Sequence, residues 1–224
     1  FRFGTSGLLY RSNKLMFDHQ TKSLWNTFEG VPVVGPLVGT RKRLNRRSVV
    51  TTTWGEWRRL HPEKTVLSLE TGYSRDYGEG VAYREYFEND ELMFDVPERD
   101  DRLPLKAEIV GVLSARNDAQ SSSFAISVKF LSEHPVYMDS YEGRDLVVLT
   151  SAKGANRVYE AGAIYFERID SDGYLIDSKG GRWMVREDGL TRLGEPIEQL
   201  GRVPSQRAFW FGWYAQFPNT RLVH

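Results

Sequence analysis

The sequence contains no cysteine, which excludes disulfide bonds, thiolate metal sites and a cysteine nucleophile within these 224 residues. It also lacks an excess of either charge, because 30 Lys and Arg residues balance 30 Asp and Glu residues. Such a chain has no overall field that would attract nucleic acid. No apolar run approaches the roughly 20 residues that a membrane-spanning helix needs. We therefore expect no nucleic-acid partner and no transmembrane segment in this chain.

Common catalytic and metal-binding motifs are missing as well. The sequence has no G-x-S-x-G elbow, no phosphate loop and no H-E-x-x-H. The spacing of the four histidines does not fit a metal site. We expect no metal and no cofactor, and the sequence leaves open whether the protein is an enzyme. Oxygen ligands from Asp95, Asp100 and Asp101 are the lowest-ranked alternative, because their spacing matches no EF-hand loop.

The six tryptophans that are present fall into two matching triplets, which indicates an internal duplication. The triplets are Trp25, Trp54 and Trp57, and Trp183, Trp210 and Trp213. Residues 54–62 and 210–218 both read W-x-x-W-x-x-x-x-P. Asp18 and Asp177 occupy equivalent places, each twelve residues before a glycine. A duplicated chain predicts two similar halves.

Short apolar runs separated by turn residues predict a mainly β (α+β) fold, with two duplicated β-rich halves that each carry a short Trp-bearing helix. We predict a first repeat at residues 1–70, an ordered linker loop at 71–105 and a second repeat at 106–224. The second repeat begins long before its Ala161-Gly162, whereas only five residues precede the matching Ser6-Gly7. We therefore expect the front of the first repeat to be missing. Strands near residues 3–10 should then lack a partner, or borrow one from another subunit or from residues 106–160.

The first Trp-bearing helix has a clear start signal. Thr53 is a good N-cap, and Glu56 three residues later completes a capping box. Trp54 and Trp57 then share one helical face. Two tryptophans on one face of a short amphipathic helix are typical of a core. We expect Trp57 and its counterpart Trp213 to be buried.

The tyrosine loop, residues 72–78, is the most specific candidate ligand site. It presents Tyr73, Arg75, Asp76 and Tyr77 between two glycines, so that a guanidinium, a carboxylate and two phenols can meet a polar ligand. The alternative is that Arg75 and Asp76 only tie the loop down. Asp18 is a further candidate, either as a second carboxylate or as the acceptor of an Asx turn.

The basic segment, residues 41–47, places five positive charges in seven residues. It could bind an anion, a polyanionic glycan or a nucleic-acid backbone. A solvated loop or an edge strand protected by charge is the favoured interpretation, because the chain as a whole is neutral and residues 198–204 of the second repeat are not basic.

Several ordered motifs resemble the DUF3179 family of bacterial and archaeal proteins. They are F-G-T-S-G-L-L-Y at 3–10, L-M-F-D-H-Q-T-K-S-L-W at 15–25, G-P-L-V-G at 35–39, T-W-G-E-W at 53–57, G-Y-S-R-D-Y at 72–77, and F-W-F-G-W at 209–213. The resemblance implies an exported or membrane-anchored protein, and it implies no particular activity. Family members carry a cysteine-containing stretch ahead of the F-G-x-S-G motif, and an arginine where this chain has His19.

These observations favour an exported binding or structural module of the cell envelope or extracellular space, whether periplasmic or fully extracellular. Its partner would be a protein, through self-association or a larger assembly, or a polar, glycan-like ligand. The alternative is a hydrolase that uses Asp, Arg and Tyr chemistry around Asp76, with Asp18 as the second carboxylate.

Overall fold

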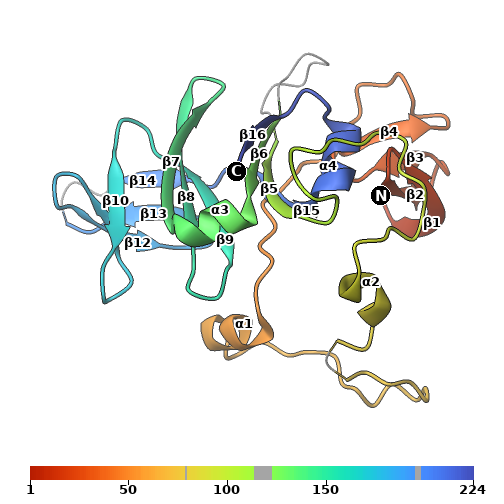
Figure 1. Cartoon of the computed structure of the whole chain (residues 1–224), viewed down its shortest axis with the longest axis horizontal. Coiled ribbons are helices and arrows are strands. Elements are labelled where there is room, and N and C mark those ends of the chain that lie inside the picture. Colours follow the sequence, from red (N-terminus) through yellow and green to blue (C-terminus); the bar gives the residue numbers. More distant parts are fainter. Residues whose placement is uncertain (79, 114–122, 195–197) are drawn as a thin grey trace.

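The computed structural model describes residues 1–78, 80–113, 123–194 and 198–224. Across these residues the protein is mainly β, as expected, with four sheets and four short helices (Figure 1). The strands are β1 (Phe3–Tyr10), β2 (Asn13–Asp18), β3 (Leu24–Asn26), β4 (Val31–Val34), β5 (Glu108–Val112), β6 (Phe124–Ser127), β7 (Val136–Tyr141), β8 (Arg144–Thr150), β9 (Asn156–Glu160), β10 (Phe166–Ile169), β11 (Leu175–Asp177), β12 (Arg182–Val185), β13 (Gly189–Arg192), β14 (Gln199–Gly201), β15 (Ser205–Phe209) and β16 (Arg221–Val223). The helices are α1 (Trp54–Leu60), α2 (Arg84–Glu88), α3 (Val128–Glu133) and α4 (Trp210–Gln216).

The N-terminal sheet is an antiparallel meander in the order β1-β2-β3-β4. Its first turn consists of Arg11 and Ser12, whose φ values of 47° and 60° lie in the left-handed region that tight two-residue hairpins use. Leu15 and Trp25 are buried in this sheet. β1 is an outer strand with β2 as its one strand neighbour among the described residues.

A second meander, in the order β10-β11-β12-β13-β14, lies at the opposite end of the molecule (Figure 1). The two meanders contain the same buried contact between neighbouring strands. In the first, the indole nitrogen of Trp25 donates to Asp18 at 2.9 Å. In the second, the indole nitrogen of Trp183 donates to Asp177 at 2.8 Å. In both, the carboxylate also accepts backbone N–H groups of the turn that follows it.

The middle of the molecule is the sheet β15-β5-β6-β16, with β7-β8-β9 beside it. The helix α4 packs on β5, so that the ring of Trp213 lies where a side chain at Gly111 would be. Trp210 and Trp213 are both fully buried, and the indole nitrogen of Trp213 donates to the hydroxyl of Thr220 at 3.0 Å. The expected burial of Trp213 is confirmed.

The helix α1 extends away from the sheets (Figure 1), and its buried Glu56 holds it to the end of β8 by accepting a hydrogen bond from the hydroxyl of Ser151 at 3.1 Å. As expected, Thr53 caps it by accepting a hydrogen bond from the backbone of Glu56. Trp54 and Trp57 stack at 5.4 Å, but Trp54 is 51% exposed and Trp57 is half-buried. The prediction of a core position is therefore wrong for Trp54 and only partly met by Trp57, because no sheet of the described chain covers this face.

The chain from α1 to β5 forms a long excursion with α2 near its middle (Figure 1). It exposes an unusual number of large apolar side chains, including Leu67 at 92%, Leu69 at 70% and Phe87 at 66%. None of the helices in the described ranges is long and apolar enough to cross a membrane.

Candidate functional site

The tyrosine loop is exposed throughout. Local bonds hold it: the carboxylate of Asp76 accepts from the backbone N–H of Gly78 at 2.8 Å, and the hydroxyls of Tyr77 and Thr71 are 2.8 Å apart. Arg75 makes no hydrogen bond or ion pair with the residues that the structure describes. Asp76 lines an open cavity of about 450 Å³ together with Tyr83, Arg84 and other residues of the excursion. The four candidate side chains are thus accessible, and they bind nothing outside the excursion.

Asp18 is buried inside the N-terminal meander rather than exposed to a ligand. One carboxylate oxygen accepts from the backbone of Thr21 at 2.5 Å, and the other from the hydroxyl of Thr21 at 2.7 Å and from Trp25 at 2.9 Å. Burial alone would raise the pKa of Asp18, but these hydrogen bonds outweigh it and lower the pKa to about 2. The carboxylate is therefore an ionised acceptor that fixes its turn and the ring of Trp25.

Of the aspartates considered as metal ligands, Asp100 is already paired with a neighbouring side chain. The carboxylate of Asp100 accepts from the guanidinium of Arg102 at 2.9 Å, an ion pair that occupies the side chain. Within the part of the chain that the structure describes, no three His, Asp or Glu side chains gather into a group that could hold a metal ion.

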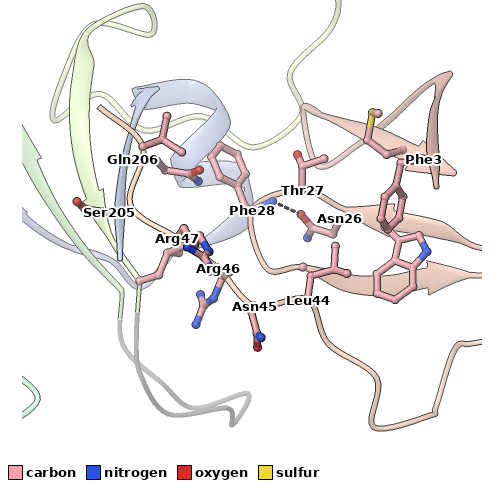
Figure 2. A pocket seen from close by; sticks show the side chains of 15 residues that line it. Phe3, Asn26, Thr27, Phe28, Leu44, Asn45, Arg46, Arg47, Ser205 and Gln206 are labelled. Atoms are coloured by element: carbon pink, nitrogen blue, oxygen red, sulfur yellow. Dashed lines mark hydrogen bonds between the residues drawn. The ribbon is translucent and has the colours of Figure 1, made fainter. Parts of the chain in front are cut away.

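A different place has the shape of a ligand site. A half-open cavity of about 350 Å³, the inter-sheet cavity, lies between the N-terminal sheet and the sheet that contains β5 and β15 (Figure 2). Its walls are mostly apolar. The apolar lining residues are Phe3, Met16, Trp25, Phe28, Leu44, Val49 and Leu113. Small-molecule sites are typically concave and apolar with a few polar groups that set orientation.

Polar groups gather at one end of this cavity. Figure 2 shows Arg46, Arg47, Ser205 and Gln206 on the side away from Phe3. The amide nitrogen of Gln206 is buried and has no hydrogen-bond partner among the described residues. Arg47 is exposed and makes no hydrogen bond or ion pair with them. Buried polar atoms are nearly always paired, so the unpaired amide nitrogen of a residue that lines the cavity is an unusual feature of this polar end.

Backbone contacts hold the cavity walls in place. The chain from 44 to 49 crosses from one sheet to the other: the N–H of Leu44 donates to the carbonyl of Gly30 at 2.8 Å, and that of Val49 to the carbonyl of Ser205 at 2.9 Å. Behind it, the buried amide of Gln216 accepts from Asn26 at 2.9 Å and donates to the carbonyls of Tyr10 and Arg11. The N-terminal sheet is thereby joined to α4.

Sequence reasoning missed this cavity because its walls come from segments far apart in the chain, at 3–49, 113 and 205–206. The basic segment was the one signal that pointed to it. Its last two residues, Arg46 and Arg47, line the polar end.

The fold and the cavity define a β-rich protein with a mostly apolar, half-open cavity between two sheets. The family model described as "Protein of unknown function (DUF3179)" matches residues 1–220, so the chain belongs to the DUF3179 family. The resemblance seen in the motifs is confirmed. Comparison with curated proteins and with solved structures gives no match.

Proposed function

We propose that the protein is an exported β-rich binding module whose small-molecule ligand occupies the inter-sheet cavity. The observation that carries the proposal is the mostly apolar cavity of about 350 Å³, whose polar end is lined by Arg46, Arg47 and Gln206. Its volume is near the lower end of known small-molecule sites, which favours a compact aromatic or aliphatic ligand over a polymer chain. Export is inferred from the family resemblance alone.

The other hypotheses receive less support. A polar, glycan-like ligand would belong to the tyrosine loop, whose accessible side chains include Asp76 at the edge of an open cavity. The hydrolase alternative needs Asp76 and Asp18 to converge on one substrate. Asp18 is enclosed by its own turn, so the described side chains lend that alternative no support.

Fluorescence titration with phenylnaphthylamine, an uncharged aromatic probe, tests the proposal. We expect saturable binding of one probe per chain. Val49→Trp places a large ring at the cavity, so it should abolish this binding, while the backbone bond of residue 49 to Ser205 can remain. The matched control is Val38→Trp, at a similarly exposed valine outside the cavity, which should bind like the unmodified protein. Equal binding by both variants would show that the probe sits elsewhere.

We also propose that the two meanders, each with its Trp-bearing helix, are copies of one unit. Support comes from the equivalent bonds of Trp25 to Asp18 and of Trp183 to Asp177. The N-cap residues of the two helices also have nearly the same backbone conformation. Thr53, before α1, has φ −74° and ψ 150°, and Phe209, before α4, has φ −76° and ψ 146°. Asp18→Asn and Asp177→Asn should therefore lower the melting temperature to similar extents. A loss confined to one variant would argue against equivalent units.

A further inference from the structure

The polar end of the inter-sheet cavity is positively charged. Arg46 and Arg47 line it, and Arg43 lies close enough to affect Arg46 electrostatically. Glu29 is the carboxylate that affects Arg46, and it accepts from the amide of Asn26 at 2.8 Å. No carboxylate is among the residues that line the inter-sheet cavity in the part of the chain that the structure describes.

The environment of Arg46 favours an added negative charge. Burial lowers the pKa of Arg46, and the positive charge of Arg43 lowers it further. An anion nearby would offset both the lost hydration and the repulsion between the two guanidinium groups. Rotation of the Gln206 amide would let its unpaired nitrogen donate to the same anion.

A neighbouring cavity of about 430 Å³ shares Arg46 and Arg47 and also contains Arg202. It suits an anion less well, because Glu187 and Asp188 line it too. Glu187 already binds the guanidinium of Arg157 at 2.6 Å. The repulsion from these two carboxylates leaves the apolar cavity as the better place for an anionic ligand with an apolar body.

We infer that the ligand of the inter-sheet cavity is an amphiphilic anion, with its apolar body against Phe3, Trp25 and Leu44 and its anionic group at Arg47. This inference rests on the proposed function of the same cavity and adds the chemical class of the ligand. Arg47 supplies a charged fork that matches a carboxylate, sulfonate or phosphate.

A pair of probes tests separately whether the cavity binds a small molecule and whether that ligand is anionic. Anilinonaphthalene sulfonate and phenylnaphthylamine share one aromatic body, and the sulfonate group is the difference between them. We expect the 224-residue protein to bind the sulfonate about tenfold more tightly than phenylnaphthylamine, because the sulfonate adds one charge-assisted hydrogen bond. Raising the salt concentration should weaken binding of the sulfonate and leave binding of phenylnaphthylamine nearly unchanged.

Arginine variants test which guanidinium group binds the sulfonate. Arg47→Gln should weaken binding of the sulfonate by about tenfold and leave phenylnaphthylamine within about twofold. Arg41→Gln is the matched control, since Arg41 is an exposed arginine of the same segment that does not line the cavity. It should change neither affinity by more than about twofold, because an exposed charge at a distance is screened. Thermal denaturation of both variants checks that they are folded.

The outcomes are distinguishable. If phenylnaphthylamine binds in the cavity but the sulfonate gains nothing, or if Arg41→Gln weakens the sulfonate as much as Arg47→Gln does, the anionic class is wrong and the cavity remains a ligand site. If neither probe binds, or if Val49→Trp leaves both unaffected, the proposed function is wrong and this inference is wrong with it.

Discussion

The indole nitrogen of Trp25 donates a 2.9 Å hydrogen bond to the carboxylate of Asp18, and the same indole lines the inter-sheet cavity. The turn residue Thr21 supplies the other two donors to that carboxylate. A buried acceptor with three donors holds its partners in one geometry. Asp18 therefore positions one wall of the cavity without lining the cavity itself.

The stability of the fold should fall in acid because of Asp18. Its pKa is about 2 in the folded protein and 3.8 as the unperturbed value, so folding favours the ionised form. The resulting stabilisation is complete above about pH 5 and is lost as the pH falls through 4 towards 2. Asp100, Asp170 and Asp177, whose pKa values are also lowered, act in the same direction. Urea unfolding midpoints measured from pH 6 to pH 2 check this.

Asp18→Asn should make that pH profile flatter, because one of the depressed carboxyl groups is gone. Asp76→Asn is the control, since Asp76 is exposed and its acceptor bond is confined to its own loop. Its profile should follow that of the unmodified protein. Identical profiles for all three proteins would mean that Asp18 does not carry the acid sensitivity.

The two W-x-x-W helices should respond differently to truncation. Trp213→Ala removes a fully buried ring and should cost about 3–5 kcal/mol of unfolding free energy, as large aromatic truncations in cores do. Trp54→Ala removes a ring that is 51% exposed and should cost less than about 1 kcal/mol. Chemical denaturation of both variants gives the comparison. A loss below about 1 kcal/mol at Trp213 would place that ring at a surface.

A glycine makes room for the ring of Trp213. A methyl group at Gly111 would overlap that ring, so Gly111→Ala should destabilise the protein by about 1–3 kcal/mol or more through overpacking. Gly201→Ala is the matched strand control, because nothing lies near its new methyl group. The control should change the melting temperature little, and an equal loss in both variants would point to strand flexibility instead of packing.

The mainly β character, the first hairpin and the cap at Thr53 could be predicted because each depends on residues close together in sequence. The exposure of Trp54 and the partial burial of Trp57 could not be predicted in this way. The pattern of α1 matches that of α4, but burial depends on a covering sheet, which α4 has in β5 and α1 lacks within the described chain. The cavity could not be predicted either, because tertiary packing brings Gln206 to the same cavity as residues of the N-terminal sheet.

The tyrosine loop provides a separate test of the hypothesis drawn from the sequence. Arg75→Ala combined with Asp76→Ala should shift the melting temperature by less than about 2 °C, because both side chains are exposed and neither joins the excursion to the sheets. If the loop binds a ligand, the double variant loses that ligand and keeps phenylnaphthylamine. Unfolding of the variant would instead make the pair a structural clasp.

A crystal structure of the protein with anilinonaphthalene sulfonate tests the central claim most directly. We expect the aromatic body to lie between Trp25 and Leu44 in the inter-sheet cavity, with the sulfonate within hydrogen-bonding distance of Arg47. An empty cavity, with the probe bound to the exposed apolar side chains of the excursion at Leu67 and Phe87, would contradict it.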